Sequence, residues 1–372
     1  MPTRLPRVVV DLEKLRHINC GLGRFSLHLA GELLRVAPGR FQPVFFLPAG
    51  VDRHLPAAGY ERLAVAVWKK EQFVRCVRPL VRPFLPPPPC DVWHVTNQMS
   101  KYLPLDPRVP VVLTIHDLTF LHEAPLEGRE REVARKLAGI RRRVRRAAAI
   151  VTDSEWVADD VRRHVPLDGR SVHVVPLGIA PPPAAATIRP AFLPDGPFLL
   201  SVGNCLPHKN FHVLLDLLEE LPGERLVIAG KKATPYGGFL EREIERRGLA
   251  DRILMPGEVS DADRQWLYGH CAAFLFPSLT EGFGLPVLEA MQSGRPVFLS
   301  RATSLPEIAG PHGFYFDSYA ATAMAAVLAE GRRRCAGDPG ADERLKRHAA
   351  SFSWAATAEG YARVYEQVIR AR

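Results

Sequence analysis

The sequence predicts an α/β protein made of two doubly wound parallel sheets, each covered by helices. Short runs of β-branched and aromatic residues alternate with longer stretches whose apolar residues recur at helical spacing. At 372 residues the chain is long for one core, so we expect two domains. A proline-rich segment near the middle, which contains Pro181-Pro182-Pro183, interrupts both periodicities and is typical of a semi-rigid linker.

Candidate strands occur throughout both halves of the chain. In the first half we expect them at residues 7–11, 43–46, 91–95, 111–115, 149–153 and 172–175. In the second half we expect them at residues 198–202, 225–229, 252–255, 273–276 and 296–299. Helical periodicity lies between them, as in Leu22, Phe25, Leu29 and Leu33.

These elements divide the chain into four parts. We expect a first Rossmann-like domain at residues 1–176, a linker at 177–194, a second Rossmann-like domain at 195–352, and a closing helix at 353–372. Ser353 is a suitable N-cap for that last helix. Two doubly wound halves joined in this way bind ligands at the carboxyl ends of their strands, in the cleft that we expect between them.

The composition, 47% hydrophobic and 24% charged, is that of a globular enzyme. No apolar run approaches the roughly 20 residues that span a bilayer, and a strand-like run directly follows the first seven residues, so we expect no signal peptide. The six cysteines form no C-x-x-C pair and no metal-like spacing, which favours reduced thiols in a cytoplasmic protein without a bound metal.

Positive charge is concentrated in the first half of the chain. Residues 1–180 contain 28 Lys and Arg against 18 Asp and Glu, whereas the remainder contains 21 against 22. Residues 67–84 and 135–146 are the most basic stretches, and such faces suit anionic lipid headgroups at about 1 kcal/mol per cation; a solvated basic face is the alternative. Nucleic acid binding is not expected, because no recognised binding motif accompanies the charge.

One stretch of the second half carries two carboxylates eight positions apart, Glu281 and Glu289. Between them, Gly282-Phe283-Gly284-Leu285 lets the backbone approach a ligand, because glycine has no Cβ and tolerates positive φ. Pro286 suits the start of a helix and Gly294 the position just past its end. A helix N-terminus behind such a turn favours a bound phosphate, and Glu289 would accept hydrogen bonds from sugar hydroxyls. The stretch predicts a nucleotide-sugar site; a loop charge and a solvated helix face are the alternative.

A second candidate segment contains Gly203 and Lys209. A strand ends just before the glycine, and Lys209 stands ahead of the next helix, where its charge would neutralise a diphosphate alongside the helix dipole. Lys231 and Lys232, which follow the next strand, would add to that charge. A solvated lysine is the ordinary alternative at each of these positions.

The first half contributes weaker candidates. Gly21-Leu22-Gly23 only partly matches a dinucleotide fingerprint, because Ser26 occupies the place of the third glycine, and NAD binding is disfavoured. The turn is a candidate for contacting phosphate or acceptor, with a plain helix start as the alternative. His116 lies at the carboxyl end of a strand and is a candidate for acid–base chemistry or hydroxyl binding. His94 and Asn97 occupy a similar edge, where a structural histidine is the ordinary alternative.

These motifs resemble the retaining glycosyltransferases of family 4, the group 1 transferases with the GT-B fold. The resemblance covers nearly the whole chain, and the spacing of Glu281 and Glu289 is highly specific for the family. The motifs that carry the resemblance are Gly21-Leu-Gly23, Thr114-Ile-His-Asp117, Thr152-Asp-Ser-Glu-Trp156, residues 202–210, Pro256-Gly-Glu-Val-Ser260, Glu281 with Glu289, Pro306-Glu307 and Phe352-Ser-Trp354.

The resemblance implies a role for each matched residue. Glu289 would bind the ribose hydroxyls of the donor, and Glu281 would lie beside the donor sugar. The backbone of residues 283–285 would approach the diphosphate, which Lys209 would neutralise. The implied catalytic residues are Glu281, His116 and Lys209. The implied donor-binding residues are Gly21, Gly23, Gly203, Lys209, Lys231, Lys232, Glu258, Val259, Glu281, Gly282, Phe283, Gly284, Leu285 and Glu289.

Four of these positions complete the implied site. Glu258 and Val259 would line the base pocket through backbone contacts, His116 would touch the donor sugar, and Gly23 would lie near the diphosphate and acceptor.

The chain departs from the family pattern in two places. Residues 204–206 lack the Arg or Lys that many relatives carry before the lysine, so we expect Lys231 or Lys232 to substitute. Residues 301–305 read Arg-Ala-Thr-Ser-Leu where relatives often have glycines.

The resemblance implies a metal-independent, retaining transferase in bacterial lipopolysaccharide or surface polysaccharide biosynthesis. The donor would be a GDP- or UDP-sugar, with mannose as first choice, and no cofactor is expected. The first domain would receive a saccharide or lipid-linked acceptor, and the second would bind the nucleotide sugar. We expect a cytoplasmic enzyme, peripheral on the inner face of the cytoplasmic membrane. The alternatives are a nucleotide-sugar epimerase or glycogen-type synthase on the same fold, and a non-catalytic membrane-associated scaffold.

Overall fold

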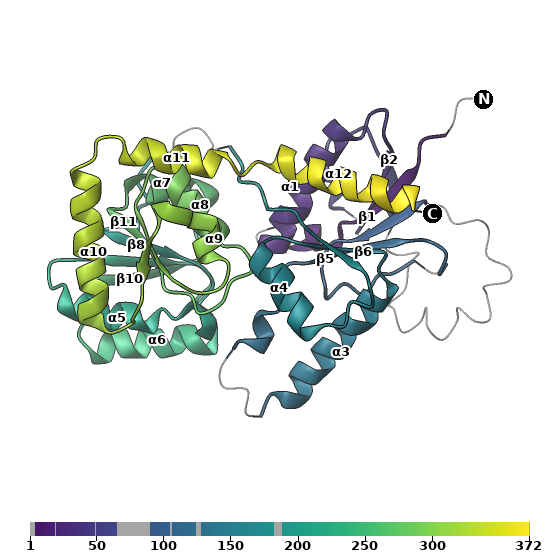
Figure 1. The fold of residues 1–372 in the computed structure, drawn as a ribbon. Coiled ribbons are helices and arrows are strands. Elements are labelled where there is room, and N and C mark those ends of the chain that lie inside the picture. The colour runs from purple at the N-terminus through teal and green to yellow at the C-terminus, as the bar shows by residue number, and fades with distance from the viewer. Residues whose placement is uncertain are drawn as a thin grey trace. The chain divides into compact units, whose positions relative to one another are not determined.

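The chain folds into two compact units, each built around its own parallel sheet (Figure 1). The computed structural model describes residues 4–18, 20–48, 50–64, 90–104, 106–123, 128–181 and 188–371. The first unit comprises Met1–Leu118, Gly128–Ala180 and Ser353–Arg372, and the second comprises Thr119–Glu127 and Pro181–Phe352. The C-terminal helix therefore belongs to the first unit, and a short segment from the first half of the chain belongs to the second.

In the described residues, the first unit holds a seven-stranded sheet in the order β3-β2-β1-β4-β5-β6-β7, and every neighbouring pair is parallel. The strand order changes direction between β1 and β4, the type of position where doubly wound sheets bind ligands. The strands are β1 (Arg7–Asp11), β2 (Gln42–Leu47), β3 (Glu61–Ala64), β4 (Val92–Val95), β5 (Val111–Ile115), β6 (Ala149–Thr152) and β7 (Ser171–Val174).

The C-terminal helix of the first unit is fastened to its sheet by buried polar groups. Helix α12 packs on α1, and its Tyr365 hydroxyl lies 2.8 Å from His94 Nδ1. His94 Nε2 lies 2.8 Å from the hydroxyl of Thr114, which in turn lies 2.9 Å from the Tyr361 hydroxyl. Burial lowers the pKa of His94 to about 3, so this histidine is a neutral structural residue. The described helices are α1 (Gly21–Val36), α3 (Glu130–Arg146), α4 (Glu155–His164) and α12 (Trp354–Arg370).

The second unit has a six-stranded parallel sheet among its described residues, in the order β10-β9-β8-β11-β12-β13. Its strand order changes direction between β8 and β11. The strands are β8 (Leu199–Val202), β9 (Leu226–Ala229), β10 (Ile253–Gly257), β11 (Ala273–Phe276), β12 (Val297–Ser300) and β13 (Phe314–Phe316). The strands predicted in both halves are confirmed to within about two residues, whereas the edge strands β3 and β13 were not predicted.

Helices cover both faces of the second sheet (Figure 1). Apolar residues of α5, α6 and α10 meet alternate strand residues in one continuous core. Side-chain caps begin several helices: the Thr234 and Ser260 hydroxyls accept hydrogen bonds from the N–H groups three residues later. The helices are α5 (His212–Glu220), α6 (Pro235–Arg246), α7 (Asp261–His270), α8 (Leu285–Gln292), α9 (Leu305–Ala309), α10 (Ala321–Ala336) and α11 (Ala341–Ala350).

Two further sequence expectations concern the whole chain. Across the described ranges, no helix is both long enough and apolar enough to cross a membrane. The five cysteines within those ranges are free thiols, while Cys76 lies outside them. The basic stretch at residues 67–84 also lies wholly outside the described residues.

Candidate active site

The centre of the candidate site is an ion pair between Lys209 and Glu281. Lys209 ends a 3-10 turn that follows β8, and Glu281 follows β11, so the pair lies where the strand order of the second sheet changes direction. Lys209 Nζ donates to Glu281 Oε1 over 2.5 Å, and each side chain is 13% exposed. Glu281 Oε2 accepts no hydrogen bond from any described residue. The pair therefore keeps one acceptor oxygen and spare ammonium protons for a ligand.

Glu281 is held by its backbone as well as by its side chain. The Ser278 hydroxyl donates to Glu281 Oε1 over 2.6 Å, so both the hydroxyl and Lys209 hold the same oxygen. The Glu281 N–H donates to Thr303 Oγ1 over 2.9 Å, and the Ser304 hydroxyl donates to the Glu281 carbonyl over 3.1 Å. Thr303 and Ser304 lacked any sequence signal, because folding brings their loop next to Glu281, and Ser278, three residues before Glu281, looks like any loop serine.

Lys209 is positioned by the turn around it. Its ammonium lies 4.9 Å from the centre of the Phe276 ring, a cation–π distance. The next residue, Asn210, has a left-handed backbone with φ of 58°, and its amide donates to the Pro277 carbonyl over 3.2 Å. This bond joins the turn after β8 to the end of β11 and thereby fixes the two halves of the ion pair.

The N-terminus of α8 presents free backbone donors close in sequence to this pair. Gly284 is the N-cap, with φ of 107°, and an added Cβ would lie 2.8 Å from the Leu305 side chain. The N–H groups of Phe283, Gly284 and Leu285 donate to no residue that the structure describes. Successive N–H groups at a helix N-terminus favour a bound anion. The predicted Pro286 lies in the first turn of the helix, and Gly294 beyond its end has φ of 70°.

Glu289 lies inside α8 and faces α7. Its Oε2 is 3.9 Å from Arg264 Nε, and the side chain is 26% exposed. Burial, together with the nearby Glu289 carboxylate, raises the pKa of the Tyr268 phenol well above its ordinary value. Arg264 and Tyr268 are thus neighbours of Glu289 that the sequence motif did not indicate.

The residues that follow β8 and β9 pack so closely that Gly230 must be a glycine. Gly230, with φ of 146°, packs so closely that an added Cβ would lie 2.1 Å from the Gly203 carbonyl oxygen. The two lysines that follow Gly230 differ in their ion pairing. Lys232 forms an ion pair with Glu241 over 2.9 Å, whereas Lys231 is exposed and ion-paired with no described residue.

Two other predicted residues follow β10. Glu258 is exposed and Val259 is half-buried, and both precede Ser260, the N-cap of α7. The role in the base pocket that the resemblance implies for their backbones stays a prediction.

His116 in the first unit has both ring nitrogens engaged. Nδ1 lies 2.6 Å from Asp153 Oδ2, and Nε2 lies 2.8 Å from the Thr96 carbonyl oxygen. Burial lowers the pKa of His116, but the Asp153 carboxylate and the Thr96 carbonyl outweigh that effect and raise it above its ordinary value. The ring is 6% exposed and contacts the edge of Phe25. Both ring nitrogens are thus satisfied by the protein, and the contact with a donor sugar that the resemblance implies for His116 stays a prediction.

The predicted glycine turn of the first unit forms the first turn of α1. Gly21 begins the helix, and no atom lies within 4 Å of an added Cβ there. An added Cβ on Gly23 would lie 2.1 Å from the His17 carbonyl oxygen, so this glycine is needed for close packing of the helix start. Close packing accounts for Gly23 without any ligand, and the role that the resemblance implies for it stays a prediction.

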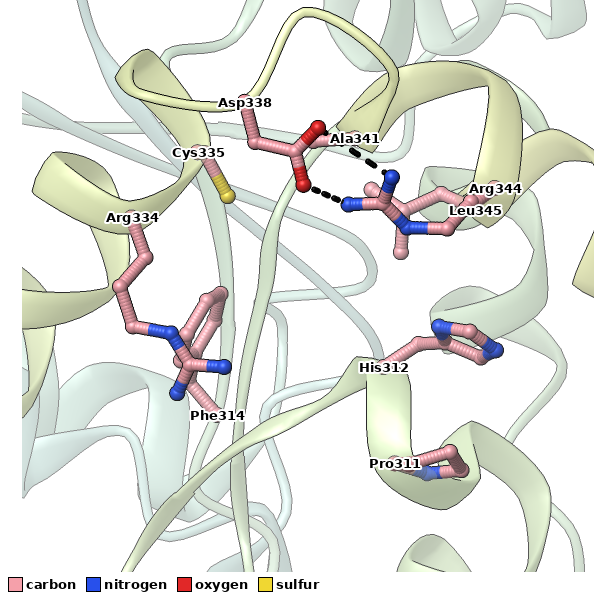
Figure 2. Close-up of a pocket in the computed structure, with 9 residues that line it drawn as sticks. All are labelled: Pro311, His312, Phe314, Arg334, Cys335, Asp338, Ala341, Arg344 and Leu345. Carbon is pink, nitrogen blue, oxygen red and sulfur yellow. Dashed lines mark hydrogen bonds and ion pairs between the residues drawn. The ribbon is translucent and has the colours of Figure 1, made fainter.

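A separate pocket of about 180 Å³ lies elsewhere in the second unit. Figure 2 shows Asp338 paired with Arg344 on one side, and Arg334 beside Phe314 on the other. None of the predicted site residues lines this pocket. In the described residues, no group of three or more His, Cys, Asp or Glu side chains is arranged to hold a metal ion.

Comparison with known families decides the relationship. The family "Glycosyltransferase Family 4" matches residues 21–181, and "Glycosyl transferases group 1" matches residues 187–331. The chain belongs to the family 4, group 1 glycosyltransferases. The predicted family is therefore confirmed.

Curated proteins related to this chain match part of its length. The serotype-specific mannosyltransferase WbdA of Escherichia coli is 35% identical over 47% of the chain and 22% of WbdA. O-antigen chain mannosyltransferase B of Escherichia coli is 34% identical over 42% of each protein. A D-inositol 3-phosphate glycosyltransferase of Segniliparus rotundus is 29% identical over 70% of the chain and 62% of that protein. The chain thus spans less than two thirds of the length of each of these relatives.

Solved structures show the same fold along the whole chain. A glycosyltransferase from Rickettsia africae gives a TM-score of 0.71 at 14% identity and covers 100% of both chains. The sucrose-phosphate synthase of Thermosynechococcus elongatus gives 0.70 at 18% identity, covering 99% of this chain and 100% of that one. HepE of Anabaena, solved with UDP and glucose, gives 0.68 at 17% identity, covering 97% and 100%. The predicted GT-B fold is confirmed.

Proposed function

We propose that this chain transfers a sugar from a nucleotide-sugar donor to a saccharide or lipid-linked acceptor in bacterial surface polysaccharide assembly. The observation that carries the proposal is the open ion pair of Lys209 and Glu281 near the free N–H groups at the start of α8. A cation and backbone donors suit a diphosphate, and an unoccupied carboxylate oxygen suits a sugar hydroxyl. Glu289, further along α8, supplies a second carboxylate for the ribose hydroxyls.

The proposed reaction develops negative charge on the departing diphosphate. The bond between the anomeric carbon and the phosphate oxygen breaks while the acceptor oxygen adds to the same face, and the acceptor proton passes to that phosphate oxygen. Lys209 and the N–H groups of residues 283–285 would stabilise the developing charge, without reorganisation at the moment of reaction. The configuration at the anomeric carbon would be retained, and we propose that no metal is required.

Mannose is the proposed donor sugar, carried by GDP. The support is that WbdA and O-antigen chain mannosyltransferase B are mannosyltransferases, as is a third relative that is 30% identical over 62% of this chain and 56% of its own length. HepE, by contrast, was solved with UDP and glucose, so a UDP-sugar is the competing donor.

A thermal-shift screen without metal tests the donor site. The purified protein is heated with GDP, UDP and ADP and with their common sugar conjugates. We expect one nucleotide series to raise the melting temperature in the wild type and not in Glu289→Ala. Incubation with the selected donor and product analysis then separate a transferase from an epimerase, which needs no acceptor. Binding without turnover or acceptor dependence would favour the non-catalytic scaffold.

We further propose that α3 contacts an anionic membrane. Not all of its arginines are available, because Arg143 is buried and donates to the Ser100 carbonyl, and Arg146 donates to the Val109 carbonyl. Arg131, Arg135 and Arg145 are exposed, and their spacing places them on one face of the helix. This exposed arginine face, rather than the whole basic run, would meet the lipid headgroups and bring the enzyme to a lipid-linked acceptor.

Vesicle sedimentation tests the exposed arginine face. Serine at positions 131, 135 and 145 should weaken binding to phosphatidylglycerol vesicles by roughly a hundredfold, at about 1 kcal/mol per cation. The matched control replaces three exposed arginines of the second unit, Arg242, Arg333 and Arg347, by serine. Equal loss in both triple variants would show a net-charge effect and contradict the assignment to α3.

A further inference from the structure

Thr303 adopts a backbone conformation that its side chain disfavours. Its φ is 53°, in the left-handed region, where the other described non-glycine residues are Asp168 and Asn210. Asp and Asn tolerate this region, but a β-branched residue there is a strained outlier. Strain of this kind persists only where the surrounding structure imposes it, so Thr303 requires a compensating interaction.

The compensating interaction is with Glu281. Thr303 Oγ1 accepts the hydrogen bond from the Glu281 N–H over 2.9 Å. The next residue, Ser304, is fully buried, and its single hydroxyl proton lies within hydrogen-bonding reach of two carbonyl oxygens, those of Glu281 at 3.1 Å and Phe283 at 3.0 Å. Two consecutive hydroxyl residues after β12 therefore hold both backbone groups of Glu281, while Ser278 and Lys209 hold its carboxylate.

We propose that Thr303 is a positioning residue whose hydroxyl sets the place of the Glu281 carboxylate. The proposal rests on the transfer activity proposed above. A glycine would adopt the same backbone angle without strain but has no hydroxyl, and a serine keeps the hydroxyl without the branch. The hydrogen bond from the Glu281 N–H therefore explains why a residue with a hydroxyl, rather than a glycine, occupies this left-handed position.

Two variants separate positioning from a structural role. Thr303→Gly relieves the strain, so it should melt no lower than the wild type, yet its kcat should fall about ten- to a hundredfold because the carboxylate is misplaced. Thr303→Ser should restore kcat. The control is Asp168→Gly, which relieves a left-handed residue in an exposed turn of the first unit and should leave kcat unchanged. Both kcat and KM are measured with the donor selected in the thermal-shift screen.

A crystal structure of Thr303→Gly completes the test without depending on turnover. We expect the Glu281 carboxylate to leave its contact with Lys209. A wild-type kcat in Thr303→Gly, a slow Thr303→Ser, or an unmoved carboxylate would each overturn the positioning role. If the wild type turns over no nucleotide sugar, the proposed function fails, and the position of the carboxylate alone then decides the role of Thr303.

Discussion

Each unit carries an acid–base pair near the carboxyl ends of its strands, and the two pairs are built differently. In the first unit the His116 and Asp153 side chains are 8% and 2% exposed, and both imidazole nitrogens are occupied. In the second unit Lys209 and Glu281 are each 13% exposed, and Glu281 Oε2 accepts no hydrogen bond from a described residue. We call the more buried pair, His116 with Asp153, the closed pair. We call the more exposed pair, Lys209 with Glu281, the open pair.

The difference shows that position at a strand end does not by itself make a residue functional. Both pairs occupy the edge of a sheet where ligands bind in doubly wound folds. What separates them is access: Asp153 Oδ1 also lacks a hydrogen-bond partner but is buried, whereas the Glu281 side chain, with its unpartnered Oε2, is 13% exposed. By this criterion the pair in the second unit is the more accessible one, and the role that the resemblance implies for His116 stays a prediction.

The largest expected effect comes from removing the cation of the open pair. Lys209→Ala should lower kcat for sugar transfer by about 10²–10³-fold, the usual loss when one preorganised electrostatic group is removed. Lys232→Ala is the matched control, because Lys232 is paired with Glu241 and should retain wild-type turnover. Equal losses in the two variants would show that general positive charge, rather than the open pair, matters.

The sequence predicted the open pair only as two separate residues. The strand–turn–helix pattern around Glu281 and the run before α5 each contain strong local signals, and β11 matches its predicted bounds. The contact between Lys209 and Glu281, 72 residues apart, depends on the pairing of β8 with β11, which no local pattern specifies.

Other features left weaker sequence signals. Strand β3 is polar and exposed at its start, and β13 is three residues long, so neither shows the buried apolar run of a central strand. The hydroxyls of Ser278, Thr303 and Ser304 come from loops, and ordinary serines and threonines look the same in a sequence. His94 resembled His116 in the sequence because its partners on α12 are contributed from the far end of the chain.

The second largest effect concerns the free donors beside the open pair. Gly284→Ala places a Cβ 2.8 Å from Leu305 at a φ of 107°, which should cost about 1–3 kcal/mol of unfolding free energy and displace the N–H groups. We expect nucleotide binding, measured by calorimetry, to weaken together with stability. Gly269→Ala is the control, because it lies in α7 with no atom near the added Cβ and should not destabilise. Unchanged nucleotide affinity in Gly284→Ala would remove α8 from the site.

The closed pair predicts a pH effect on stability rather than on binding. Folding raises the pKa of His116 above its ordinary value of 6.5. The His116 contribution to the free energy of unfolding is therefore complete below pH 6.5 and is lost as the pH rises through the pKa of the folded protein. The melting temperature should therefore fall on the alkaline side of pH 6.5. This slope should flatten in Asp153→Asn and persist in Asp159→Asn, which removes an exposed carboxylate. Identical slopes in both variants would contradict the assignment.

The smallest expected effect is a difference in nucleotide affinity between variants of the adjacent residues Lys231 and Lys232. Lys231 is exposed and ion-paired with no described residue, so Lys231→Ala should weaken nucleotide diphosphate binding a few-fold, about 0.5–1 kcal/mol for an exposed charge. Lys232→Ala should leave the affinity unchanged, because Glu241 already neutralises Lys232. A larger loss of affinity in Lys232→Ala than in Lys231→Ala would show that the ion pair of Lys232 with Glu241 opens to receive the ligand.

The most direct test of the open pair is calorimetric titration of the selected nucleoside diphosphate into the wild type, Lys209→Ala and Glu281→Gln. Lys209→Ala should bind at least about tenfold more weakly, or about 1.4 kcal/mol. Glu281→Gln should bind as tightly as the wild type or more tightly, because Lys209 is no longer shared with a carboxylate. Weaker binding in Lys209→Ala, without any weakening in Glu281→Gln, is the predicted result. Equal weakening in both variants, or wild-type affinity in Lys209→Ala, would contradict the account.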